Sequence, residues 1–71
     1  MYFPRLRDMR EDADLTQAQV AEMLGIAQTV YSRYERGFQT IPLGLLINLA
    51  DRYEVSIDFL VGRTNQMKMN Q

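Results

Sequence analysis

The apolar residues of this chain recur at the three- and four-residue spacing of an α-helix, in five segments separated by short turns. The five segments start near Pro4, Thr16, Gln28, Pro42 and Ser56. In the first, Leu6, Met9 and Ala13 share one side, with Arg and Asp residues on the other. The pattern therefore predicts an all-α fold, a compact bundle of five helices without strands.

The second and third segments are joined by a tight turn. Thr16 and Gln19 have the spacing of a capping box, which favours a helix start at this point. Gly25 follows the second helix and can adopt the left-handed backbone that lets a chain turn sharply. A third helix is predicted from about Gln28 to Arg36. Two short helices and a glycine turn over residues 16–36 are typical of a helix-turn-helix DNA-binding unit.

The third helix is predicted to have two unlike faces. With about 100° between successive residues, one side carries Ala27, Val30, Tyr31 and Tyr34, and the other carries Gln28, Thr29, Ser32 and Arg33. We expect the first side to belong to the core and the second to be displayed. The tyrosines are thus expected to be core residues first, with the Tyr31 hydroxyl able to reach a phosphate.

Composition narrows the function classes. Of 71 residues, 46% are apolar and 24% are charged, as in one small globular domain. Without cysteine or histidine and without a Gly-rich phosphate loop, neither a nucleophile–base pair nor a thiolate metal site can be assembled. The acidic residues of the first helix are expected to form a solvated face: Asp8, Glu11, Asp12 and Asp14. We expect no enzyme activity, no cofactor and no metal.

Charge and hydropathy bear on partners and location. The net charge of −1 does not favour nucleic acid, but the stretch from Ile26 to Thr40 holds Arg33 and Arg36 against Glu35 alone. The most apolar run, Leu43–Ala50, is too short to cross a bilayer. We expect a cytoplasmic protein with a weakly positive face and no membrane contact.

The chain is expected to consist of a folded helical domain and a short C-terminal tail. Residues 1–64 are predicted to form the helical domain. The polar tail from Arg63 lacks periodicity and is expected to fray, so residues 65–71 are assigned to a C-terminal tail.

From about Leu6 to Thr64 the sequence resembles the phage-repressor and Cro type of helix-turn-helix regulators, the XRE-like family. The resemblance rests on LTQAQVAEMLGI, on the ERG that ends the third helix, and on IPLGLLINLADRYEVSIDFLVGRT. It implies a lambda-repressor-like five-helix fold, DNA binding through the third helix, and a symmetric homodimer on a pseudo-palindromic operator in double-stranded DNA. Ala27 departs from the family, which usually has Ser or Thr capping the third helix.

Base contacts are expected from the displayed face of the third helix. Arg33 can bond both O6 and N7 of a guanine, Gln28 can pair with adenine, and Thr29 can offer its methyl group to thymine. The resemblance places base contacts at the same positions. Taken without the motif, these side chains could equally be a solvated helix face.

Phosphate contacts are expected around this face. Gln17 lies in the first turn of the second helix, where free N–H groups and the helix dipole favour an anion, although it could also simply face water. The full set of phosphate candidates is Gln17, Ser32, Tyr31, Phe38, Gln39 and Thr40.

One ion pair is expected inside the fold. Glu35 is poorly placed for DNA because phosphate repels a carboxylate, and its angular position near Tyr31 turns it towards the first helix. We predict a structural ion pair between Arg10 and Glu35, and the resemblance implies the same bridge.

Two function classes remain open. The favoured one is a sequence-specific transcriptional regulator, a repressor. The alternative is an antitoxin-like or protein-interaction module whose main partner is a toxin or a phage protein, with secondary DNA binding. A homodimer contact could come from apolar residues near the fifth helix: Ile57, Phe59 and Val61.

Overall fold

The computed structural model describes residues 1–67, and within them it contains five helices and no strand. The helices are α1 (Pro4–Asp12), α2 (Gln17–Leu24), α3 (Gln28–Arg36), α4 (Leu43–Tyr53) and α5 (Ile57–Leu60). The predicted all-α, five-helix fold is confirmed. None of the described helices combines the length and apolar character needed to cross a bilayer.

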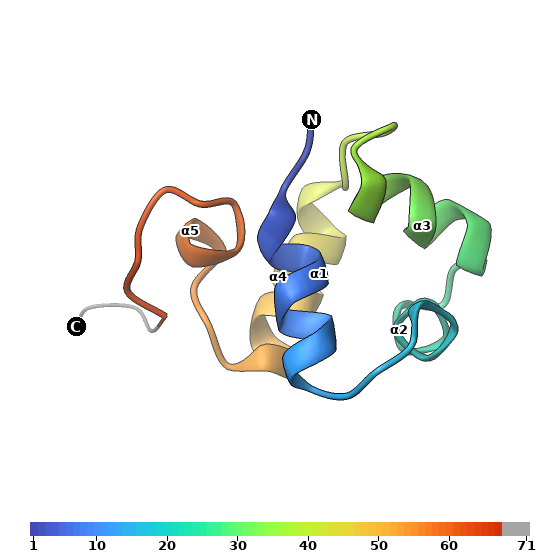
Figure 1. The fold of residues 1–71 in the computed structure, drawn as a ribbon, viewed down its shortest axis with the longest axis horizontal. Helices are drawn as coiled ribbons and strands as arrows, with labels where there is room; N and C mark the ends of the chain where they lie inside the picture. The colour runs from blue at the N-terminus through green and yellow to red at the C-terminus, as the bar shows by residue number, and fades with distance from the viewer. Residues whose placement is uncertain (68–71) are drawn as a thin grey trace.

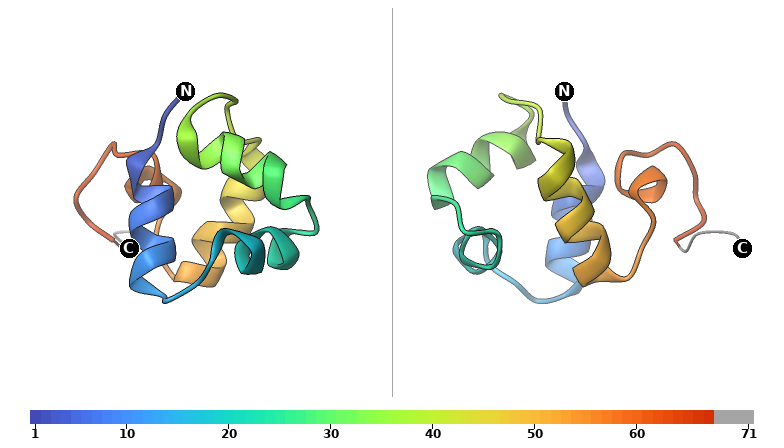
Figure 2. Two further views of the ribbon diagram at one scale, coloured as in Figure 1. Left: turned by 45° about the vertical axis from the view of Figure 1, so that its right-hand side comes forward. Right: turned by 180° about the vertical axis from the view of Figure 1, so that it is seen from behind.

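The helices are arranged around α1 and α4, which occupy the middle of the molecule (Figure 1). The α2–α3 pair lies on one side of them and α5 on the other, as the view from behind also shows (Figure 2). α2 packs mainly on α3, whereas α1 contacts both α3 and α5. Helix α3 therefore packs against two other helices, α1 and α2.

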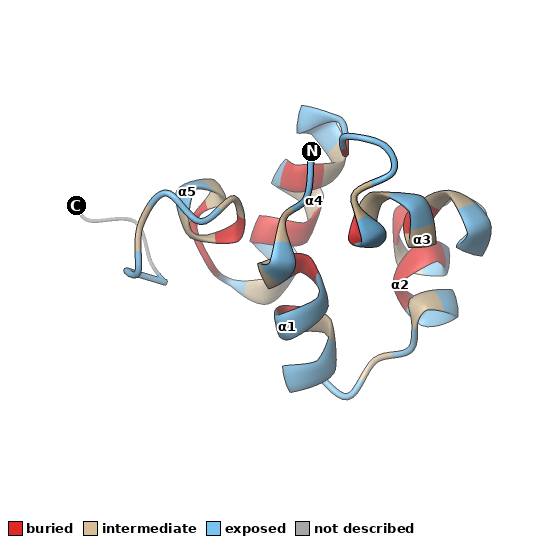
Figure 3. Cartoon of the chain, turned by 45° about the horizontal axis from the view of Figure 1, so that its top comes forward, coloured by how far each residue is buried: buried red, intermediate tan, exposed pale blue. Residues whose placement is uncertain are grey.

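Every helix contributes one fully buried side chain to the core. These five are Leu6, Val20, Tyr31, Leu49 and Leu60, in chain order from α1 to α5. Burying a side chain of this size contributes about 1.5–3 kcal/mol. All five belong to one hydrophobic cluster, which joins the five helices. The buried positions line the inner sides of the helices (Figure 3).

Local signals fix the ends of α2 and the turn that follows it. The Thr16 hydroxyl accepts a hydrogen bond from the Gln19 N–H at 3.1 Å, and the Gln19 side chain accepts one from the Thr16 N–H at 2.8 Å. The predicted capping box is thus present. Gly25 has φ of 71° and ends α2 in the left-handed region.

Two of the residues expected in the core are on the surface. Ala13 follows the end of α1 and is exposed, because the helix stops at Asp12. Ala27 is the exposed N-cap of α3, and Val30 is only half-buried. Angular position predicts the side of a helix, but a residue at the helix end has no neighbour to cover it.

The acidic residues of α1 and of the turn that follows it lie where they were expected. Asp8, Glu11, Asp12 and Asp14 are all exposed, which confirms a solvated face.

The start of the expected polar tail is hydrogen-bonded to the helical domain. Arg5 on α1 donates hydrogen bonds to the carbonyls of Phe59 and Thr64 and to Asn65 Oδ1. The Met67 carbonyl accepts a hydrogen bond from the Ser56 N–H. Thr64 and Asn65 are therefore bonded to α1 and Met67 to the N-cap of α5, and the assignment of residues 65–71 to a tail stays a prediction. Residues 68–71 of the expected tail lie outside the described residues.

Candidate nucleic-acid interface

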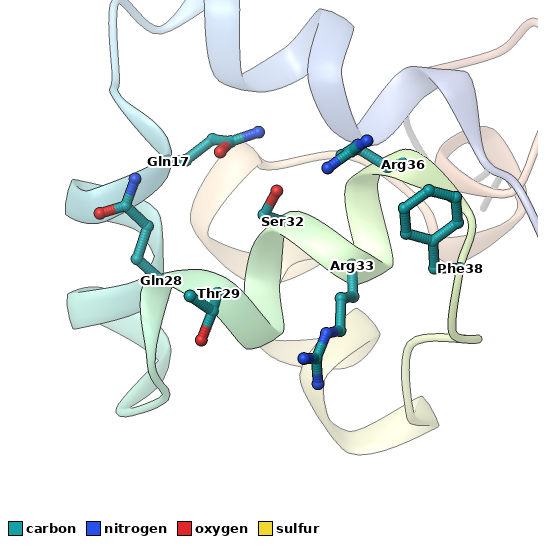
Figure 4. Close-up of a pocket in the computed structure, with 7 residues that line it drawn as sticks. All are labelled: Gln17, Gln28, Thr29, Ser32, Arg33, Arg36 and Phe38. Carbon is teal, nitrogen blue, oxygen red and sulfur yellow. The ribbon is translucent and has the colours of Figure 1, made fainter.

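The outer face of α3 lines a shallow hollow of about 330 Å³ (Figure 4). Gln28, Thr29 and Arg33, the predicted base-contacting residues, are all exposed there. The remaining lining residues are Gln17, Ser32, Arg36 and Phe38. The structure thus brings the three base candidates together with three of the six phosphate candidates.

The side chains on this face project to different sides of the helix axis. In Figure 4, Thr29 and Arg33 point to one side of α3, while Gln28 and Ser32 point to the side of Gln17. Thr29 and Arg33 are four residues apart, so they stand one turn from each other on the same strip of the helix. The hollow therefore has one edge formed by α3 alone and another shared with α2.

An ion pair anchors the buried side of α3. Glu35 is only 4% exposed, and its carboxylate accepts hydrogen bonds from Arg10 Nε at 2.8 Å and Arg10 Nη2 at 2.9 Å. Arg10 Nη1 also donates to the Leu15 carbonyl. The predicted pair between Arg10 and Glu35 is present, and its two parallel hydrogen bonds fix the distance between α1 and α3.

Gln17 belongs to this buried network as well as to the hollow. Its Nε2 donates to Glu35 Oε1 at 3.2 Å, and the residue is half-buried. The Gln17 amide is therefore held by the buried Glu35 carboxylate rather than free in water. A side chain expected only at the surface connects α2 to the underside of α3.

The charge state of Glu35 follows from its neighbours. Burial alone would raise its pKa, but the hydrogen bonds from Arg10 and Gln17 and the charge of Arg10 outweigh burial, so the pKa lies below its ordinary value. Glu35 is consequently ionised at neutral pH and remains a full partner of Arg10. Removing one member of such a buried pair typically costs about 3–5 kcal/mol.

Tyr31 is not a phosphate contact. Its side chain is fully buried, and among the described residues its hydroxyl has no hydrogen-bonding partner. Burial, followed by the nearby negative charge of Glu35, raises the pKa of Tyr31. The expectation that this hydroxyl reaches DNA is wrong because the aromatic ring occupies the centre of the core and carries the hydroxyl with it.

The loop after α3 divides into two parts. Phe38 is 68% exposed and lines the hollow. Gln39 and Thr40 are also exposed but lie outside the lining, and the Thr40 hydroxyl accepts a hydrogen bond from the Met1 nitrogen at 2.9 Å. The predicted phosphate set is therefore spread over a wider surface than the hollow itself.

A family model described as Helix-turn-helix matches residues 6–60, which is most of the chain. The chain belongs to the helix-turn-helix family. A curated relative named an uncharacterized HTH-type transcriptional regulator, YobD of Bacillus subtilis, is 43% identical over 92% of this chain and 58% of its own length.

Two further relatives extend the comparison. The cryptic phage CTXphi transcriptional repressor RstR of Vibrio cholerae is 42% identical over 83% of this chain and 53% of its own length. A crystal structure of a transcriptional regulator from Listeria innocua superimposes with a TM-score of 0.78 at 30% identity, covering 94% of this chain and 62% of that one. This helix-turn-helix chain spans just over half the length of the curated relatives named here.

Arg36 is the residue of the helix-turn-helix hollow that the sequence analysis did not assign. It is the last residue of α3, and its guanidinium carbon lies 4.6 Å from the centroid of the Phe38 ring. Gln28, Ser32 and Arg36 are spaced four residues apart, so the helical period was the signal that could have placed Arg36 beside them.

The apolar residues expected at a dimer contact are only partly available. Ile57, Phe59 and Val61 are half-buried and pack against the core, and Arg5 stacks on the Phe59 ring at 4.0 Å. The large apolar side chains exposed on α4 of this helix-turn-helix fold are Leu43 and Ile47. The apolar surface near α5 is smaller than the sequence suggested because α1 covers part of it.

Proposed function

We propose that this chain binds double-stranded DNA in a sequence-specific manner and acts as a transcriptional regulator, specifically a repressor. The observation that carries the proposal is the asymmetry of α3. Its inner face is anchored through Glu35, while its outer face presents Gln28, Thr29 and Arg33 around one hollow. A helix held in this way can enter the major groove without rearranging the fold.

Each displayed side chain has a distinct role in this proposal. Arg33 contacts guanine O6 and N7 together, Gln28 pairs with adenine, and Thr29 packs its methyl group on thymine. Gln17, Ser32 and Phe38 contact the sugar–phosphate backbone beside the hollow, with Gln39 and Thr40 further along the same strand. The backbone contacts set the register and the base contacts set the sequence preference.

The proposal includes a symmetric homodimer on a pseudo-palindromic operator, acting in the cytoplasm. Two copies of α3 would occupy half-sites about 34–36 Å apart on one face of the duplex. Sedimentation of the protein with operator DNA tests this directly. Two chains per duplex support the dimer, and a single chain at saturation contradicts it.

The test of function is a titration against DNA selected from a random pool and against shuffled DNA, each at two salt concentrations. A regulator gives tight binding that resists shuffled competitor and weakens steeply with salt. Arg33→Ala should lose the preference at one base pair per half-site, whereas Arg63→Ala, which removes the same charge after α5, should leave that preference intact. A chain that ignores all DNA would favour the antitoxin-like interaction module instead.

A further inference from the structure

A second hollow adjoins the first on the side of α1. It shares Gln17, Arg36 and Phe38 with the hollow on α3, and it is lined in addition by Tyr2 and Arg7 and by the Arg10–Glu35 pair. The three shared residues therefore form a ridge between two continuous depressions. In Figure 4 the Arg36 guanidinium on this ridge points toward Gln17.

The second hollow concentrates positive charge in a chain whose net charge is −1. Its lining contains three arginines, Arg7, Arg10 and Arg36, against one carboxylate, Glu35. Arg10 already donates three hydrogen bonds, two to Glu35 and one to the Leu15 carbonyl. The other two arginines, Arg7 and Arg36, approach the hollow from α1 and α3.

We propose that this second hollow binds a phosphodiester group of the DNA backbone, held between Arg7 and Arg36. This inference rests on the proposed function, and it extends the DNA-binding surface from the helix-turn-helix unit onto α1. A guanidinium on each side matches the spread negative charge of a phosphodiester, and the Gln17 amide supplies a further donor at the ridge.

The two arginines differ in the contacts they make within the protein. Arg36 is stacked on Phe38, which limits the directions its long side chain can take. Arg7 is held by Glu11 one helical turn away, with Arg7 Nε 3.3 Å from Glu11 Oε1. Because both partners of that pair are more than half exposed, the pair is weak, and Arg7 can exchange Glu11 for a phosphate at little cost.

The experiment compares the affinity and the salt dependence of four variants on selected and on shuffled DNA. Arg7→Gln and Arg36→Gln are the test variants, and Arg63→Gln is the control of equal charge change. Each test variant should weaken binding to both DNAs by about tenfold at about 0.1 M salt and lower the slope of log K against log salt by about 1. Arg33→Gln, the fourth variant, should instead change the sequence preference.

Glu11→Gln provides a gain-of-binding counterpart. Releasing Arg7 from Glu11 should tighten binding to both DNAs, and Asp51→Asn, an exposed charge change on α4, should tighten it less. The gain from Glu11→Gln should largely disappear when Arg7→Gln is already present, because the two residues act as a pair. Thermal unfolding of every variant verifies that the fold is retained.

The outcomes separate this inference from the proposed function. Arg7→Gln and Arg36→Gln could match Arg63→Gln in affinity and slope while Arg33→Gln still alters the sequence preference. In that case the second hollow does not bind DNA, and the proposed function stands. If the parent protein binds neither DNA, both proposals fall together.

Discussion

The two faces of α3 have opposite relations to the rest of the molecule. The inner face carries Tyr31 in the centre of the core and Glu35 in a double hydrogen bond with Arg10. The outer face carries Thr29 and Arg33, which are exposed. One helix of nine residues therefore separates positions that determine stability from positions free to bind a partner.

This separation means that the exposed residues of α3 can be changed without removing contacts in the core. A change at Arg33 removes no contact in the core, whereas a change at Glu35 leaves Arg10 partly buried without its partner. We expect substitutions on the inner face to change the free energy of unfolding and substitutions on the outer face to change DNA binding. The following predictions test that division.

The largest effect is expected for Glu35→Ala. The change leaves Arg10, whose side chain is 13% exposed, without a counter-charge, so the free energy of unfolding should fall by about 3–5 kcal/mol. Urea unfolding measures it, with Glu11→Ala on the solvated face of α1 as the matched control. A loss below about 1 kcal/mol would place the pair among ordinary surface pairs.

The pH dependence of stability should show the same pair. Since the folded-state pKa of Glu35 lies below its unfolded value, the stabilisation is complete above about pH 4.5 and is lost as the pH falls through the folded-state pKa. The unfolding free energy of the parent should therefore fall more steeply with acidification than that of Glu35→Gln. Parallel urea titrations between about pH 6 and pH 3 provide the comparison, and equal slopes would exclude this role for Glu35.

On the outer face, Arg33→Ala should leave unfolding within about 0.5 kcal/mol of the parent. Its loss of DNA binding on the preferred sequence should be about 1–3 kcal/mol, because the bidentate contact to guanine is lost. Fluorescence anisotropy with labelled duplexes measures the binding. A loss that is the same for every sequence would reassign Arg33 to the backbone.

A smaller effect is expected at the start of α3. Ala27 occupies the N-cap and offers no side-chain acceptor to the free N–H groups of the first turn. Ala27→Ser should raise the free energy of unfolding by about 0.5–2 kcal/mol and slow amide exchange in α3. Base preference should be unchanged, since Ala27 precedes the displayed face; Ala27→Val, which adds no acceptor at an N-cap, is the comparison.

The smallest effect on binding is expected for Tyr31→Phe. The hydroxyl is buried, so its removal should change neither DNA affinity nor the salt slope. A loss of affinity that is the same for every sequence in the same anisotropy titration would mean that Tyr31 does contact a phosphate after all.

Short-range signals in the sequence were sufficient to predict most of the elements. Thr16 and Gln19 form their capping box within one turn, Gly25 takes the left-handed backbone, and Ser56 caps α5 through the Phe59 N–H. Each of these features depends on residues within four positions of one another. Such contacts can be predicted from the sequence without knowing how the helices pack.

Features that depend on packing were not predictable in the same way. A helical period indicates which side of α3 Tyr31 occupies but not how deeply it is buried. Arg5 finds its partners 54 to 60 residues further along the chain, and no local pattern specifies that contact. The link from Gln17 to Glu35 likewise requires two helices to be placed first.

Two arginines on α1 connect regions that lie at opposite ends of the molecule in Figure 1. Arg5 donates hydrogen bonds to α5 and to the segment that follows it. Arg10, five positions later, donates to Glu35 of α3. α1 thus makes side-chain contacts with both flanks of the molecule. The segment after α5 and the helix that we assign to the major groove therefore do not have to touch each other, because both are positioned by side chains of the same nine-residue helix.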